Sequence, residues 1–457
     1  MIELEKYVDI EDILDNATNV AEILNERDLE TIGHEVVNGY DDDRDSRAEW
    51  EERNEAAMEL ALQVTEEKND PWPGAAHVKY PLLTTAALQF SSRAYPALIS
   101  SSNIVKGRVI GFDKTGEKMQ RAIRIGKHMS YQLIEQMEDW EEEMDKLCLT
   151  LPILGCIFKK TYYCPTKGVN VSEVIYPKDL VINYFSPTIE KSQRITHVLQ
   201  MTENDIYERK ASGLYLEGVE LTKEDIDVSE EDRNRGLEAP QQQDSTLPYN
   251  VLEQHCLIDL DGDGYKEPYI VTVHEDSAQV LRIIPRYTVE SIVGGESGSV
   301  VRITPIQYFT KFGFIPSPDG SIYDLGFGTL LGPMNDTINT LINQLLDAGT
   351  MSNLQSGFIS KGIRIKGGNH RFKPNEWKSV NTTGDDLRKG IYPLPTREPS
   401  NVLYTLLNTM VSSGERLSSV TEMMTGEIPG QNTKATVAMA AIEQGMKVFS
   451  AIYKRIY

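Results

Sequence analysis

The chain has 457 residues, 40% of them apolar, which is enough to build more than one hydrophobic core. Its formal net charge of −23 argues against a protein that holds nucleic acid through a broad basic patch, because affinity for phosphates comes mostly from lysine and arginine. The same charge argues against adhesion to an anionic membrane, but it does not exclude a protein that encloses DNA without holding it.

Residues 1–17 carry acids where a secretory signal would need a basic and then an apolar run. The longest apolar-rich run, at 147–158, is too short to span a bilayer, so we expect a soluble intracellular protein. Four cysteines do not make a disulfide framework. Cys148, Cys156 and Cys164 recur every eight residues, a spacing that fits neither zinc ligands nor a redox pair, and we expect them to be buried as small apolar residues.

The first third of the chain is predicted to be helical. Residues 41–68 carry eleven acids and four bases, and they predict an amphipathic surface helix whose inner face consists of Trp50, Ala57, Leu60, Ala61 and Val64. A second helix is expected at 81–100. Residues 116–147 predict one long helix, with an apolar stripe made of Leu133, Met137, Trp140, Met144 and Leu147. Its opposite face is acidic and consists of Glu135, Glu138, Asp139, Glu142 and Glu143.

From residue 157 the pattern changes to short runs typical of β-strands, at 157–164, 171–176, 179–184 and 195–201. Residues 220–244 carry nine acids and three bases, which predicts an exposed or mobile segment. Strand character returns at 251–314, and helical patterns follow at 323–351, 401–424 and 433–457. Together these elements predict an α+β fold.

The most acidic short motif is Asp259, Asp261 and Asp263, followed by Gly264. These residues match the first half of an EF-hand loop, but position twelve is Ile270 instead of glutamate, and the flanks are typical of strands. Two interpretations stay open. The motif is either a polar turn between two strands, or the same turn also holds a divalent cation such as calcium, whose candidate ligands are Asp259, Asp261, Asp263 and Glu267.

Sequence motifs of enzymes are missing. The chain has no phosphate-binding loop, no dinucleotide-binding glycine pattern, no HExxH and no GxSxG, and its seven histidines are scattered. We therefore do not expect an enzyme.

The helix at 323–351 carries Asn335, Asn339 and Asn343 at successive i+4 positions, so the three side chains share one face. No lysine or arginine occurs between Phe312 and Ser360. This polar row either faces solvent or a neighbouring helix, or it lines a conduit. A wall of amides and acids would let a DNA duplex slide, because there are few cations to hold its phosphates.

Several stretches, taken in order, resemble the portal proteins of tailed bacteriophages, which form the ring at one capsid vertex. They are NDPWPGAAHVKYPLLTTAALQF at 69–90, VIYPKDLVINYFSP at 174–187, RITHVLQMTENDIY at 194–207, CLIDLDGDGYKEPYIVTV at 256–273, ITPIQYFTKFGF at 303–314, YDLGFGTLLGPMNDTINTLINQLLDAGT at 323–350 and PLPTREPSNVLYTLL at 393–407. The resemblance extends over most of the chain and rests on the order of the stretches.

The resemblance implies a portal-type subunit with an α/β wing, a helical stem and a β-rich clip. The wing would begin at 1–200, and residues 201–246 would supply the first stem segment and an acidic linker. The clip would lie at 247–312 and the stem helix at 313–351. Residues 352–432 would return to the wing and carry the channel-proximal helix, and 433–457 would start a crown or form a terminal helix.

The resemblance also implies a function and partners. Twelve copies would form a conduit for packaging and ejecting double-stranded DNA, with no sequence-specific binding and no membrane contact. The expected partners are the terminase, the major capsid and scaffolding proteins, and a head-completion or adaptor protein. The protein would be found in the virion, at the capsid vertex, and in the host cytoplasm during assembly. The alternatives are a hydrolase that depends on a divalent cation and a calcium-binding structural module.

Overall fold

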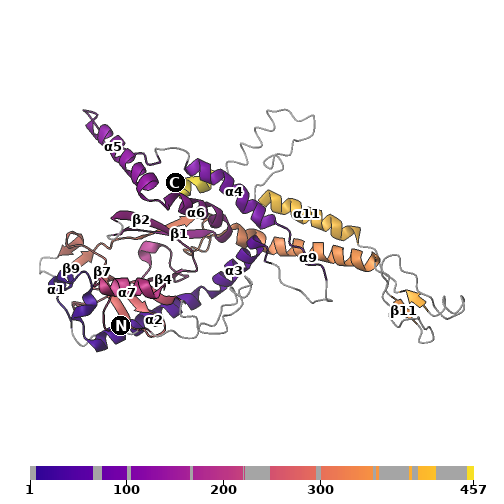
Figure 1. Cartoon of the computed structure of the whole chain (residues 1–457). Coiled ribbons are helices and arrows are strands. Elements are labelled where there is room, and N and C mark those ends of the chain that lie inside the picture. Colours follow the sequence, from indigo (N-terminus) through magenta and orange to yellow (C-terminus); the bar gives the residue numbers. More distant parts are fainter. Residues whose placement is uncertain are drawn as a thin grey trace. The chain divides into compact units, whose positions relative to one another are not determined.

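The structure is a computed structural model, and it describes residues 7–64, 75–99, 104–164, 168–219, 221, 248–294, 300–353, 357–359, 391–393, 400–417 and 450–457. These residues form helices and antiparallel sheets, which confirms the predicted α+β class (Figure 1). The chain divides into two compact units. The first contains residues 1–64, 83–332 and 418–457, and the second contains 65–82 and 333–417. Within the described ranges, no helix is long and apolar enough to cross a membrane.

Six helices before residue 220 lie in the described part of the first unit, apart from α4. They are α1 (Ile10–Asp15), α2 (Glu26–Ser46), α3 (Ala48–Leu62), α5 (Glu117–Tyr131), α6 (Trp140–Leu154) and α7 (Glu203–Ala211), with a π-turn η2 (Gln132–Gln136) and 3-10 turns η1 (Val20–Ile23), η3 (Ile189–Lys191) and η4 (Val289–Ser291). Helix α4 (Leu82–Leu98) lies almost wholly in this unit. It confirms the helix predicted at 81–100.

The larger sheet has the strand order β3-β4-β5-β6-β7, with every neighbouring pair antiparallel. Its strands are β3 (Leu180–Ile182), β4 (Ile195–Met201), β5 (Tyr249–Ile258), β6 (Glu267–His274) and β7 (Val280–Pro285). Strand β6 is buried along its whole length. The sheet therefore joins strands on both sides of residues 201–246, so the predicted wing and the predicted clip share one sheet.

One face of this sheet is covered by the N-terminal elements. Ile13, Val20 and Ile32 share a buried core with Tyr269, Val271 and other residues of the sheet. Asn19 provides partners for backbone groups of the edge strand β7. Ile283 N donates to Asn19 Oδ1 at 3.1 Å, and Asn19 Nδ2 donates to Leu281 O at 3.4 Å. This side chain thus takes the place of a further strand, which is one way to protect a sheet edge.

The smaller sheet has the order β10-β1-β2 and consists of β1 (Cys156–Cys164), β2 (Val169–Ile175) and β10 (Phe309–Gly313). A short hairpin, β8 (Ile292–Gly294) and β9 (Val300–Ile303), pairs separately. Strands β1 to β4 confirm the runs predicted at 157–201, which are short and rich in β-branched and aromatic residues. The core beside the smaller sheet includes Trp50, Phe158 and Tyr323.

Gly155 ends α6 and starts β1 with φ of +91°, a left-handed conformation that a side chain disfavours. A Cβ atom there would lie 2.2 Å from Asp324 O and 2.4 Å from Gly326 N. Both contacts are with backbone, which cannot move aside without shifting the chain.

We therefore expect Gly155→Ala to lower the free energy of unfolding by about 2 kcal/mol or more, from the strained dihedral and the clash together. The matched control is Gly320→Ala, since Gly320 has φ of +79° and open space around it. That change should cost about 1 kcal/mol. Urea denaturation of both variants measures the difference. Equal losses of unfolding free energy in the two variants would mean that the close backbone contacts at Gly155 add nothing to the cost of the substitution.

Two helix predictions in the first half are wrong in extent. The single helix predicted at 116–147 is broken after η2, where Met137 leaves helical geometry (φ −94°, ψ 87°), and α6 continues to Leu154. The helix predicted at 41–68 is the end of α2 followed by α3, with a break at Arg47. The inner face is confirmed for Trp50, Ala57, Leu60 and Ala61, which are buried, whereas Val64 is half-buried after α3 has ended.

The second unit contains most of α9 (Phe327–Asn353), the hairpin strands β11 (Gly357–Ile359) and β12 (Ile391–Pro393), and α11 (Asn401–Leu417). Helix α9 confirms the helix predicted at 323–351, with a start four residues later. Figure 1 shows α11 beside α9. They are closely packed, since a Cβ at Gly414 would lie 3.2 Å from Met334 Sδ.

Some predictions fall outside the described residues: the mobile segment at 220–244, most of 352–400, and residues 418–449. Of the terminal helix predicted at 433–457, residues 450–456 are helical, and Ile452 and Ile456 are buried. Cys148 and Cys156 are buried free thiols, as predicted, whereas Cys164 is only half-buried because it lies at the end of β1. Burial raises the pKa of Cys148 and of Cys156 to about 12.

Candidate functional site

The acidic motif forms the loop between β5, which ends at Ile258, and β6, which begins at Glu267. This confirms the prediction of a turn that joins two strands. Each of Asp259, Asp261, Asp263 and Glu267 offers a carboxylate oxygen, and these oxygens all lie within 4.8 Å of one another. The four candidate ligands predicted from the sequence are thus brought together.

The shape of this loop is set by hydrogen bonds from its own backbone. Asp259 accepts from Gly262 N at 2.7 Å and from Gly264 N at 3.1 Å, and Asp263 accepts from Tyr265 N at 2.6 Å. Gly262 and Gly264 both have positive φ, which explains why glycine occupies these positions. These local hydrogen bonds hold the side chains of Asp259 and Asp263 within the loop.

Glu267 differs from the three aspartates because it is fully buried. Its Oε2 accepts from Leu260 N at 3.3 Å, and its Oε1 has no hydrogen-bond partner in the described part of the chain. Burial, and then the charge of Asp261, raises the pKa of Glu267 to about 8. Burial also raises the pKa of Asp261. A buried carboxylate beside other carboxylates needs either a proton or a cation.

The asparagine row of α9 faces the chain's own backbone. Tyr80 N donates to Asn339 Oδ1 at 2.7 Å, and Val78 N donates to Asn343 Oδ1 at 2.8 Å. Asn343 Nδ2 returns a bond to Val78 O at 3.2 Å, and Ala76 N donates to Asp347 Oδ1 at 2.7 Å. Every second backbone amide of the segment at 76–80 thus donates to a side chain of α9, and these side chains are spaced four residues apart.

The geometry explains this match. Two residues of extended chain advance about 6.6 Å, and four residues of helix advance about 6 Å, so the two spacings nearly coincide. Asn335 is the next residue of the row, and Leu82 would supply the next amide of the segment. The Leu82 amide already donates to Tyr80 O, and the side-chain amide of Asn335 has no hydrogen-bond partner within the described ranges. In the single chain Asn335 and Asn339 are buried. The predicted lining of a conduit concerns an assembly of many copies and stays a prediction.

We expect Asn343→Ala to loosen the segment at 76–80, because the side chain makes two hydrogen bonds to Val78. The loss of about 1–1.5 kcal/mol should speed hydrogen exchange at the Val78 amide roughly tenfold. Gln344→Ala is the matched control, since Gln344 is exposed on the same helix. If both variants exchange at the rate of the unmodified protein, the row does not hold the segment.

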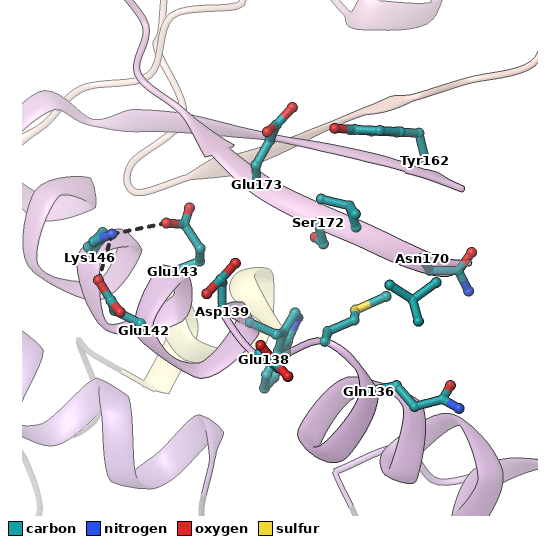
Figure 2. Close-up of a pocket in the computed structure, with 14 residues that line it drawn as sticks. Gln136, Glu138, Asp139, Glu142, Glu143, Lys146, Tyr162, Asn170, Ser172 and Glu173 are labelled. Carbon is teal, nitrogen blue, oxygen red and sulfur yellow. Dashed lines mark hydrogen bonds and ion pairs between the residues drawn. The ribbon is translucent and has the colours of Figure 1, made fainter. Parts of the chain in front are cut away.

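An acidic cavity of about 710 Å³ lies between β2 and the η2–α6 region. Its lining includes Glu138, Asp139, Glu142, Glu143 and Glu173, so four residues of the acidic face predicted for 116–147 meet a strand here. Lys146 lies on α6 with Glu142 and Glu143, and Figure 2 shows its ion pairs with both. The Nζ atom of Lys146 is 2.8 Å from Glu142 Oε1 and 3.1 Å from Glu143 Oε1. Such a cavity repels phosphates and favours cationic groups.

The sequence did not predict a buried polar network that joins Lys160 on β1 of the smaller sheet to residues of the larger sheet. Lys160 Nζ pairs with Glu253 Oε1 at 2.7 Å, and His255 Nε2 lies 3.3 Å from the same oxygen. The Nδ1 of His255 lies 3.2 Å from Arg286 Nη1. No sequence signal pointed to this set, since its members come from β1, from β5 and from the residue after β7.

A scan of the chain against protein-family models found no match, and a search of the curated proteins found no similar sequence.

Proposed function

We propose that the chain is the repeating subunit of a portal-type ring that conducts double-stranded DNA during packaging and ejection. The ordered sequence stretches at 69–90, 174–187, 194–207, 256–273, 303–314, 323–350 and 393–407 support this proposal. The α+β fold and the long helix α9 agree with what the resemblance implies.

The observation that carries the proposed mechanism is the outward face of α9. Asp336, Thr340 and Gln344 follow one another at i+4 spacing and are exposed. They lie in the stretch from Phe312 to Ser360, which contains no lysine or arginine. The asparagine row packs on the segment at 76–80 within the single chain, and we propose that this exposed face also belongs to the conduit wall. A duplex that passes such a surface forms no charge contacts that must break before it moves.

The proposal includes an assembly and its partners. Twelve copies close into a ring at one capsid vertex, where the ring meets the capsid and scaffolding proteins. The terminase docks during packaging and supplies the ATP hydrolysis, and a head-completion or adaptor protein docks afterwards. The chain itself performs no catalysis.

Negative-stain electron microscopy of the purified full chain tests the assembly. The proposal expects rings with a central opening, twelve-fold by class averaging. A sedimentation profile that stays monomeric at tens of micromolar, together with an absence of rings, would overturn it. Nuclease or glycosidase activity that appears with added divalent ions would favour the hydrolase alternative.

The mechanism is tested separately with a charge swap on assembled rings. T340K/Q344K places two cations on the exposed face of α9, and T340E/Q344E is the control with similar bulk and opposite charge. We expect the lysine pair to retain DNA, with the logarithm of the retention constant falling by about 0.9 per phosphate contact for each decade of salt. The glutamate pair should release DNA as the unmodified ring does. Equal retention by both pairs would show that this face is not the wall.

A further inference from the structure

The spacing of the acidic oxygens in the β5–β6 loop fits a calcium ion. Calcium binds oxygen ligands at 2.3–2.6 Å, so ligands on opposite sides of the ion are about 4.6–5.2 Å apart. The four carboxylate oxygens lie within 4.8 Å of one another. One ion at their centre can therefore reach all four, and the exposed loop leaves room for water to complete its shell.

The unpartnered Oε1 of Glu267 is the second, independent observation. Glu267 lies at the first position of β6, is fully buried, and joins the group formed by the three loop aspartates. The principal charges acting on it come from Asp261 and Asp259 and have the same sign as its own. A buried carboxylate oxygen with no donor and with like-charged neighbours is the arrangement that a cation stabilises.

The ligand set favours calcium over other divalent ions. All four groups are hard carboxylate oxygens, whereas zinc prefers nitrogen or sulfur donors. Magnesium keeps several waters and binds through one or two carboxylates, whereas calcium accepts six to eight ligands in irregular geometry.

The N-terminal segment lies directly on this loop. Val8 N donates to Leu260 O at 2.9 Å, and Leu260 lies between the ligands Asp259 and Asp261. A Cβ at Gly262 would lie 2.8 Å from the ring of Tyr7, so the ring packs against the loop backbone. Val8 and Leu260 also share one buried core cluster. The loop conformation therefore decides whether residues 7 and 8 have a surface to pack on.

We propose that the β5–β6 loop binds one calcium ion through Asp259, Asp261, Asp263 and Glu267, and that the ion holds the N-terminal segment at Tyr7–Val8 on the sheet. The ion neutralises the four carboxylates and keeps the carbonyl of Leu260 pointed at the amide of Val8. This proposal is independent of ring formation, so either one can fail without the other.

Binding is tested by calorimetric titration of the chelator-treated full chain with calcium chloride. We expect one ion per chain. Asp263→Asn, at an exposed position, should weaken binding on the order of tenfold or more, because affinity follows the number of charged ligands. Glu267→Gln tests the buried ligand in the same way, and exposed Glu290→Gln is the control. No heat of binding up to about 1 mM calcium would overturn the site.

Hydrogen exchange at the Val8 amide tests whether calcium binding holds the N-terminal segment on the sheet. With calcium, exchange should slow on the order of fivefold or more compared with the chelated protein, whereas the amides of β1 and β2 should not change. Asp263→Asn should lose this protection at a calcium concentration that saturates the unmodified protein. Calcium binding without a change at Val8 would overturn the role in holding the segment.

Discussion

Replacing Arg47 with methionine should lower the free energy of unfolding by about 3–5 kcal/mol, the cost of breaking a buried ionic network. Arg47 is only 1% exposed. Its Nη1 donates to Pro177 O at 2.7 Å, to Leu180 O at 2.9 Å and to Tyr323 Oη at 3.1 Å. Its Nη2 donates to Lys178 O at 3.1 Å.

Further contacts fix the same guanidinium. It pairs with Glu51, and its Cζ lies 5.7 Å from the centre of the Trp50 ring and 5.8 Å from that of Tyr323. Methionine keeps the apolar stem but leaves several backbone carbonyls without donors, which is the costly part of the change. The residue thus connects the break between α2 and α3 to the strand β3.

Urea denaturation followed by circular dichroism measures this loss. The control is Arg124→Met, an exposed arginine of α5, which should change the stability by less than about 0.5 kcal/mol. If Arg47→Met does not fold, Arg47→Lys keeps the charge but not the fork of donors, and it should be intermediate. A loss below about 1 kcal/mol for Arg47→Met would contradict the role of the network.

Two buried histidines should each contribute a loss of stability between pH 7 and pH 5, because they stay neutral in the folded state. Burial lowers the pKa of His255 to about 4 although the neighbouring Glu253 acts to raise it, and burial lowers the pKa of His197 to about 3. An arginine can only donate, so Nδ1 of His255 accepts from Arg286, and Nε2–H donates to Glu253. Protonation would place a second N–H against the guanidinium.

The sign follows from the direction of these shifts. The unfolded histidines have a pKa near 6.5, so the unfolded state takes up protons first as the pH falls. The stability is complete above that pKa and is lost as the pH falls toward the folded values, by roughly 2 kcal/mol per histidine between pH 7 and pH 5. The pKa of Glu253 is held well below its usual range by Lys160 despite burial, which adds to the loss in the same direction at lower pH.

Urea denaturation at pH 7, 6 and 5 measures this dependence. His255→Gln provides the comparison, because glutamine can donate to Glu253 and accept from Arg286 without titrating. It should remove roughly 2 kcal/mol of the pH-dependent loss. If the variant and the unmodified protein lose the same stability, His255 is not one of the titrating groups.

The order and type of most elements could be predicted from the sequence because local periodicity reports them. The runs at 157–201 are short and rich in β-branched and aromatic residues, and they form β1 to β4. The apolar stripe at 323–351 repeats every three or four residues and forms most of α9. The loop at Asp259–Gly264 was predicted as a turn for the same local reason, since aspartate and glycine tolerate its dihedrals.

The partners of polar side chains could not be predicted in this way. The spacing of Asn339 and Asn343 defines a shared face, but only the fold brings the amides of Val78 and Tyr80 against it. Met137 continues an apolar stripe in the sequence, yet the helix breaks there before α6 packs on the smaller sheet.

The sequence alone thus determined the α+β class, the positions of its main strands and helices, and the set of four acids in one hairpin. Only the tertiary structure decided that Glu267 is buried, that Arg47 joins α2 and α3 to β3, and that His255 lies between Glu253 and Arg286. The physical reason is that periodicity is a property of neighbouring residues, whereas burial and polar pairing depend on segments that are distant in the chain.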